Sequence, residues 1–266
     1  LHFLEPHLPI IPLPPYLNMF GKPKDEKNRV IDRIIDLIGA GHDFSDEEIS
    51  EIINDYDSTI AYVDNEVGTL LKGLKDQGMY DESLIFFLSD HGEALYEHQV
   101  FSHGSNVYPE TMHVPLLIKF PASMGLNGLR IKRFVQLHSI YPTIADIFGT
   151  RLTMDGTSLL ETLGNPDIGD DFTVGRSFTE AAIYNIAFRK WFLLYHMNSN
   201  QRELYYHLGQ KDLKRENPEM VKLLESYLFR WYDRIQKNSL GGSLKIDLKD
   251  LPTEQLENLK SLGYID

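Results

Sequence analysis

The chain has 266 residues, of which 42% are hydrophobic, and a formal net charge of −13; this composition is typical of one large α/β domain or of one domain with an appendage. The acidic charge argues against a nucleic-acid partner, which would need a basic face, although metal cations and histidines could still bring an anionic substrate to such a chain. The absence of cysteine excludes disulfides and a thiol nucleophile within these residues, and no apolar stretch is long enough for a transmembrane segment.

The chain opens with a predicted strand end at residues 1–4, and a proline-rich loop continues to residue 23. Because proline fixes φ and has no N–H donor, we expect this loop to be extended and irregular. His7 lies between Pro6 and Pro9, which would position its ring at a reduced entropic cost. It is either a group that contacts a leaving-group oxygen or an ordinary surface histidine.

Two helices are predicted next. Residues 25–39 have the apolar spacing of a short amphipathic helix. Ser45 and Glu48 form a capping-box pattern, and behind it apolar residues recur at intervals of three and four from Ile49 to Leu74. We expect this helix to end near Gly78 and to pack its apolar face against a sheet.

Residues 84–93 are the most informative segment, because an apolar run is followed directly by Asp90, His91, Gly92 and Glu93. The run predicts a buried central strand, and open α/β sheets bind ligands at the carboxyl ends of such strands. Where the chain turns there, the carboxylate of Asp90 and the imidazole of His91 can converge on one divalent metal. The alternative is that Asp90 caps the turn and His91 is an ordinary loop histidine.

A further histidine, His103, lies in the polar stretch at residues 101–106. Its imidazole can orient a bound anion or transfer a proton to it. An exposed loop histidine is the alternative interpretation.

The following elements continue the α/β pattern. Residues 114–120 and 131–137 are predicted strands, and residues 139–148 are a predicted helix that Gly149 closes. The order of helix, strand, loop, strand and helix fits a layered α/β sheet.

From about residue 172 the pattern changes to a smaller α+β subdomain. Residues 188–196 and 203–206 are predicted antiparallel strands, and residues 219–235 and 252–262 are predicted helices. We therefore divide the chain into residues 1–171, which belong to the α/β domain, and residues 172–266, which form the subdomain.

The succession of these segments resembles the sulfatase family, within the alkaline-phosphatase superfamily. The resemblance extends along nearly the whole chain and rests on residues 2–9, 56–68, 84–93, 103–104, 108–116, 137–146, 155–159, 203–205 and 259–264. Glu5 stands where the family has an aspartate. The resemblance implies an alkaline-phosphatase-like three-layer α/β/α sheet, incomplete here, with a smaller carboxyl-terminal α+β subdomain.

The resemblance also implies roles for four residues. Asp90 and His91 match the family's second pair of metal ligands. His103 stands where the family has a lysine or histidine that touches sulfate or phosphate oxygens, and His7 matches a histidine near the leaving-group oxygen. Calcium is the metal that we expect, and manganese, magnesium and zinc are the alternatives. The metal would bind the ester anion and lower the pKa of the nucleophile.

Some parts of the family's site have no counterpart in this sequence. These are the first metal-binding aspartate pair and the Cys-x-Pro-x-Arg or Ser-x-Pro-x-Arg motif in which formylglycine forms. The resemblance therefore implies a fragment of a metal-dependent sulfuric ester hydrolase, inactive without the amino-terminal half as its partner. The alternatives are a phosphodiesterase, phosphonate hydrolase or phosphoethanolamine transferase of the same superfamily, acting on phosphate esters or related substrates, and a non-catalytic homologue.

Overall fold

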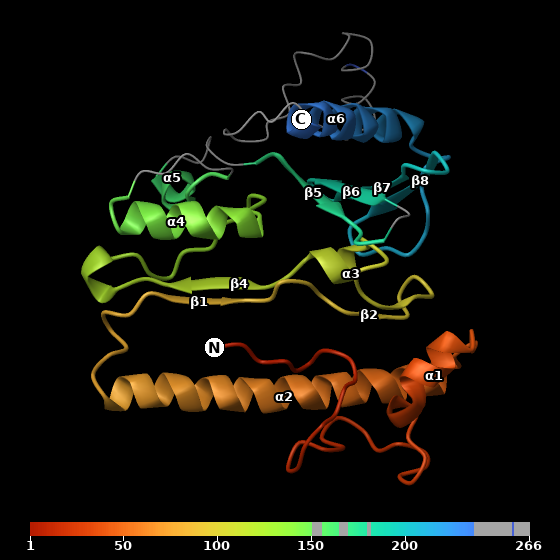
Figure 1. Cartoon of the computed structure of the whole chain (residues 1–266), viewed down its shortest axis with the longest axis horizontal. Helices are drawn as coiled ribbons and strands as arrows, with labels where there is room; N and C mark the ends of the chain where they lie inside the picture. Colours follow the sequence, from red (N-terminus) through yellow and green to blue (C-terminus); the bar gives the residue numbers. More distant parts are fainter. Residues whose placement is uncertain (151–155, 165–169, 180–181, 237–256, 258–266) are drawn as a thin grey trace. The chain divides into compact units, whose positions relative to one another are not determined.

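The computed structural model describes residues 1–150, 156–164, 170–179, 182–236 and 257 (Figure 1). The chain divides into two compact units, which we describe separately. The first unit comprises Leu1–His103 and Val114–Gly128, and the second comprises Gly104–His113 and Leu129–Asp266. The boundary expected near residue 171 stays a prediction.

The amino-terminal segment of the first unit has no regular structure. The predicted strand end at residues 1–4 is wrong, because these residues are irregular and pair with no strand. A turn follows, in which the N–H of His7 donates to the carbonyl oxygen of Leu4 at 3.0 Å. The prolines that follow cannot donate to a ladder, which favours this irregular path. Ile10 is buried and anchors the segment in the core of the unit.

Helices of the first unit follow the predicted order with shifted bounds. The predicted helix at residues 25–39 is shorter than expected and consists of the 3₁₀ turn η1 (Ile31–Arg33) and helix α1 (Ile34–Gly39). The long helix α2 (Asp46–Asp76) begins at the predicted capping box, with Ser45 and Glu48 bonded reciprocally. It ends just before Gly78, whose φ of +67° closes the helix as predicted.

The core of the first unit forms around the buried face of α2. Ile52 is fully buried and packs with the following residues: Ile10, Val30, Ile31, Ile34, Phe44, Leu95 and Phe101. Leu95 and Phe101 belong to a small hairpin of β2 (Ala94–Leu95) and β3 (Phe101–Ser102). The burial of Leu95 and Phe101 fixes the hairpin to the helices.

Strand β1 (Ile85–Leu88) pairs antiparallel with β4 (Leu116–Lys119), and both were predicted in place. The expectation of a buried central strand is wrong: Phe87 and Leu88 are 42% and 38% exposed, and β4 is the partner of β1 in the described part of the chain. An apolar run reports side-chain character but not the number of neighbouring strands, so it could not distinguish these cases. A 3₁₀ turn, η2 (Ala122–Met124), follows β4.

In the second unit, a four-stranded antiparallel sheet carries helix α6 (Pro218–Gln236) on one face (Figure 1). The strands are β5 (Phe172–Arg176), β6 (Ile183–Phe188), β7 (Trp191–His196) and β8 (Gln201–Tyr206), paired in chain order. The predicted antiparallel arrangement and the helix are confirmed, but β5 and β6 were not predicted, and a turn at Arg189 and Lys190 precedes β7. The last predicted helix lies almost wholly outside the described residues.

The remaining helices of the second unit are short. They are α3 (Pro109–Met112), the 3₁₀ turn η3 (Leu137–Ser139), α4 (Ile140–Ile147) and α5 (Leu159–Gly164). The predicted helix and its stop at Gly149 are confirmed as α4. The strand predicted at residues 131–137 is wrong, because that segment makes one isolated bridge, from Phe134 to Asp170. No helix among the described residues has the length and apolar character that a membrane crossing requires.

A tight turn at Gly156 locks the segment before α5 onto α4. The hydroxyl of Ser158 donates to the carboxylate of Asp146 at 2.8 Å, and the N–H of Leu159 donates to the hydroxyl of Thr143 at 2.8 Å. Gly156 has a φ of +93°, and a Cβ there would lie 2.5 Å from the ring of His138. Glycine is therefore required at this position by both its conformation and the close approach.

We expect Gly156→Ala to lower the free energy of unfolding by about 2 kcal/mol, because alanine is strained at this φ. Gly164→Ala is the matched control, because a Cβ there would meet nothing within 4 Å apart from its chain neighbours and the backbone of its own helix. Urea unfolding followed by circular dichroism measures both. Equal stability of the two variants would contradict this account of the turn.

A buried ion pair, Arg29 with Asp55, joins the segment before η1 to α2. The other carboxylate oxygen of Asp55 is buried and has no hydrogen-bond partner. Burial raises the pKa of Asp55 from 3.8 to about 6. The positive charge of Arg29 lowers this pKa, and the negative charge of Glu51 raises it further, but burial is the largest effect. Because the folded protein binds this proton more tightly than the unfolded chain does, the folded state is more stable at low pH, where Asp55 is protonated, than at high pH, where it is ionised.

The contribution of Asp55 to stability should be fully present below about pH 4 and lost as the pH rises through about 6. Relative to Asp55→Asn, the wild-type chain should lose about 3 kcal/mol of unfolding free energy over that range. Urea titrations of both proteins across the range measure this difference, with Asp64→Asn, which removes an exposed carboxylate of the same helix, as the control. A difference that stays constant with pH would contradict the prediction.

Candidate active site

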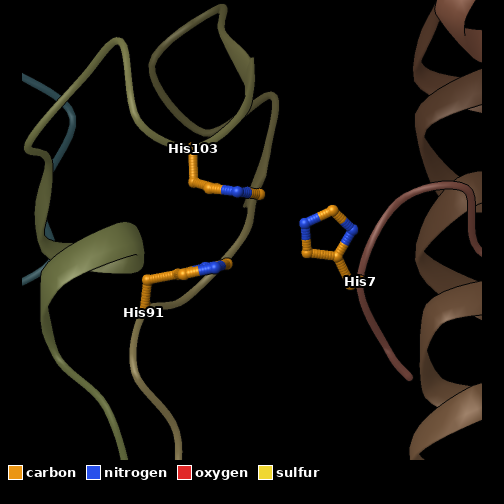
Figure 2. Close-up of side chains that lie close together, drawn as sticks. All are labelled: His7, His91 and His103. Carbon is orange, nitrogen blue, oxygen red and sulfur yellow. The ribbon is translucent and has the colours of Figure 1, made fainter. Parts of the chain in front are cut away.

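Three histidines of the first unit converge, and all three were singled out from the sequence (Figure 2). The ring centroids of His91 and His103 lie 3.7 Å apart with the rings stacked, and His7 meets them from the opposite side at 5.8 and 4.7 Å. One nitrogen from each ring lies within 4.8 Å of the others. Within the described residues, no other set of three His, Asp, Glu or Cys side chains brings its ligand atoms this close together.

The short hairpin explains how one of the three rings is placed. Ala94 of β2 pairs with Ser102 of β3, so the next pair outward in the same register is Glu93 with His103. Side chains of directly opposed residues lie close enough to interact. The left-handed backbone of Ser102, with φ of +68°, turns the chain just before His103.

Each of the three rings has its Nδ1 atom engaged by the protein. Nδ1 of His7 bonds to the carbonyl oxygen of Leu8, and Nδ1 of His91 bonds to that of Gly92 at 3.0 Å. Nδ1 of His103 bonds to Oε1 of Glu93 at 3.1 Å. Because a carbonyl or carboxylate oxygen only accepts, this pattern assigns a proton to Nδ1; Nε2 can then bind a cation through its lone pair or, in the imidazolium form, donate a hydrogen bond to an anion.

Asp90 stands beside His91 at the carboxyl end of β1, as predicted, but its side chain is 78% exposed. Its Oδ1 accepts from the N–H of His91 at 3.1 Å and lies 3.8 Å from Nε2 of the same residue. Two donor atoms at that separation can both reach one cation at about 2.0–2.4 Å from each. The geometry is therefore compatible with the turn-capping alternative and with a shared metal, and the donor set fits a divalent ion.

Glu93 is the residue of this site that the sequence did not single out. Its side chain is only 4% exposed, and its second oxygen, Oε2, accepts from the backbone N–H of Leu8 at 3.4 Å. Burial, followed by the charge of Glu93, raises the pKa of nearby Tyr56. The available signal was its place in the same tetrad as Asp90 and His91, but the sequence gives no indication that the carboxylate is buried.

Comparison with known proteins identifies the chain's relatives. The protein-family model described as Sulfatase matches residues 1–150, more than half of the chain. The chain belongs to the sulfatase family. The resemblance inferred from the sequence motifs is thus confirmed.

Two relatives show how much of a sulfatase is represented. Arylsulfatase K of Danio rerio is 33% identical over 131 residues, which are 48% of this chain and 24% of that protein. An arylsulfatase of Clostridium perfringens is 25% identical over 249 residues, which are 85% of this chain and 49% of that protein. The chain thus spans less than half the length of these curated relatives.

Among solved structures, the phosphonate monoester hydrolase of Agrobacterium radiobacter superimposes with a TM-score of 0.69 and 23% identity, covering 87% of this chain and 56% of the other. This likeness confirms the predicted alkaline-phosphatase-like α/β fold. The roles of Asp90, His91, His103 and His7 remain predictions, supported by the geometry described above.

Proposed function

We propose that this chain provides the metal-binding and anion-binding part of a sulfuric ester hydrolase. One observation carries the proposal: in a member of the sulfatase family, three imidazoles converge with each Nδ1 engaged and each Nε2 available. Ring nitrogens held in fixed orientations can bind a cation through their lone pairs or, when protonated, donate to the oxygens of an ester anion.

Asp90 and His91 would hold a divalent metal. When bound, the metal would neutralise the ester anion and lower the pKa of the attacking group. His91 is suited to this role because the bond from its Nδ1 to Gly92 holds the ring in place and leaves Nε2 as an electron-pair donor. We place calcium first, with manganese, magnesium and zinc as alternatives, because one carboxylate and one imidazole discriminate little among them.

His103 and His7 would contact the substrate. As an imidazolium, His103 can donate from Nε2 to an oxygen of the sulfate group while Nδ1 keeps its bond to Glu93. His7, which faces it from the other side, can reach the leaving-group oxygen (Figure 2). In each case the Nδ1 bond limits rotation of the ring, so the nitrogen that faces the substrate is fixed before binding.

The ester could be a sulfate or a phosphate. The arylsulfatase relatives favour a sulfate ester, whereas the phosphonate monoester hydrolase of similar fold keeps phosphoryl substrates as the second candidate. The nucleophile distinguishes these enzymes, and we propose that it is a formylglycine supplied, with the first metal aspartates, by the missing amino-terminal half.

The exposed ribbon of β1 and β4 offers a surface for that half. Phe87, Leu88 and Leu117 are 42%, 38% and 60% exposed, and apolar side chains on a strand pair are normally covered by further strands or helices. Together with the share of the relatives' length that the chain spans, this supports a partner formed by the rest of the same enzyme.

Metal binding is testable on this chain alone. We expect calorimetric titration with Mn²⁺ to show one site, and Asp90→Ala or His91→Ala to weaken its affinity at least about tenfold, because each removes one of the few donors. His113→Ala, which removes an exposed histidine outside the cluster, is the control. Unchanged affinity in both site variants would overturn the assignment of these residues as metal ligands.

Catalysis should require the missing half. We expect no hydrolysis of an aryl sulfate or aryl phosphate above the uncatalysed rate by this chain with calcium, manganese or zinc, since it lacks the proposed nucleophile. A longer protein that joins this chain to an aspartate pair and a Cys-x-Pro-x-Arg motif should hydrolyse the aryl sulfate. Clear turnover by the chain alone would show that the nucleophile lies within these residues.

A further inference from the structure

We propose that Glu93 is a positioning residue that holds His103 and the His7 loop in register, so that both imidazoles face the same substrate anion. The inference rests on the proposed function only in naming the anion as the ligand. The juxtaposition itself depends on contacts within the first unit.

The two oxygens of Glu93 serve two different segments. Oε1 accepts from Nδ1 of His103 at 3.1 Å, and Oε2 accepts from the N–H of Leu8 at 3.4 Å. Leu8 follows His7 directly, and its own carbonyl oxygen is the acceptor for Nδ1 of His7. One side chain therefore connects the residue after β3 with the proline-rich loop, which has no regular structure to hold it.

A buried carboxylate suits this connection better than other side chains. Glu93 is 4% exposed, and a buried charge is stable only when its oxygens are hydrogen-bonded. A carboxylate accepts at both oxygens, whereas the amide of glutamine accepts at one and donates at the other. Glu93→Gln therefore keeps the shape of the side chain but can satisfy both Leu8 and His103 only if His103 moves its proton from Nδ1 to Nε2.

The effect on the site follows from the freedom that these bonds remove. Without the bond to Glu93, the ring of His103 could turn or place its proton on Nε2, and the amino-terminal loop would lose a contact next to His7. A displacement of about 1 Å at a reacting group can lower a rate by about a hundredfold. The loss should affect kcat more than KM, since the metal would still bind the substrate anion.

The first experiment needs no activity. Two-bond ¹H–¹⁵N NMR spectra of this chain report which nitrogen of each histidine carries the proton. We expect His103 to be protonated on Nδ1 in the wild type and to shift to a mixture of tautomers in Glu93→Gln, with faster hydrogen exchange at the amide of Leu8. Glu97→Gln is the matched control, because Glu97 accepts from the N–H of Leu95 at 2.7 Å on the same hairpin.

The second experiment uses the longer protein described above. Glu93→Gln should lower kcat at least about tenfold with KM changed less than about twofold, and this loss should shrink in a His103→Ala background. Unchanged His103 tautomer and Leu8 exchange in Glu93→Gln would overturn the positioning role, whatever the enzyme hydrolyses. Altered NMR spectra with an unchanged kcat would also overturn it, whereas a metal or substrate different from those proposed would leave the NMR result standing.

Discussion

The candidate site depends on the anchoring of one very short hairpin. Leu95 and Phe101, which face each other across β2 and β3, are buried in the core that forms around Ile52 of α2. That burial fixes the register in which Glu93 opposes His103, just beyond the paired residues. Two paired residues per strand would not be stable alone in water, so the helical core, rather than the ladder, determines the geometry of the site.

The same core also holds the irregular segment that carries His7. Ile10, which lies three residues after His7, is 2% exposed and packs with Ile34 and Ile52. The segment is thus held by side-chain burial at one point and by the backbone bond of Leu8 to Glu93 at another. Chain segments remote in sequence can form a precise cluster only when such non-local contacts offset the entropy of ordering the loop.

The sequence predicted the elements in which local signals agree. The capping box at Ser45, the apolar spacing of α2, α4 and α6, and the stops at Gly78 and Gly149 depend on residues within a few turns of each other. The exposure of β1 and the absence of a strand at residues 131–137 depend instead on which neighbours are available. For the same reason His7, His91 and His103 could be named in advance, while the buried partner Glu93 could not, since its role arises from the register of β2 and β3.

The chain crosses between its two units after His103, His113 and Gly128, so neither unit is one continuous stretch of sequence. Residues 104–113, which include the fully buried Val107, belong to the second unit although both flanking stretches belong to the first. Truncating the chain after His103, His113 or Gly128 would therefore leave part of one unit without the residues against which it packs. A single cut cannot separate the two units cleanly: even a stop codon after Gly128, which keeps every residue of the first unit, leaves residues 104–113 without the rest of the second unit.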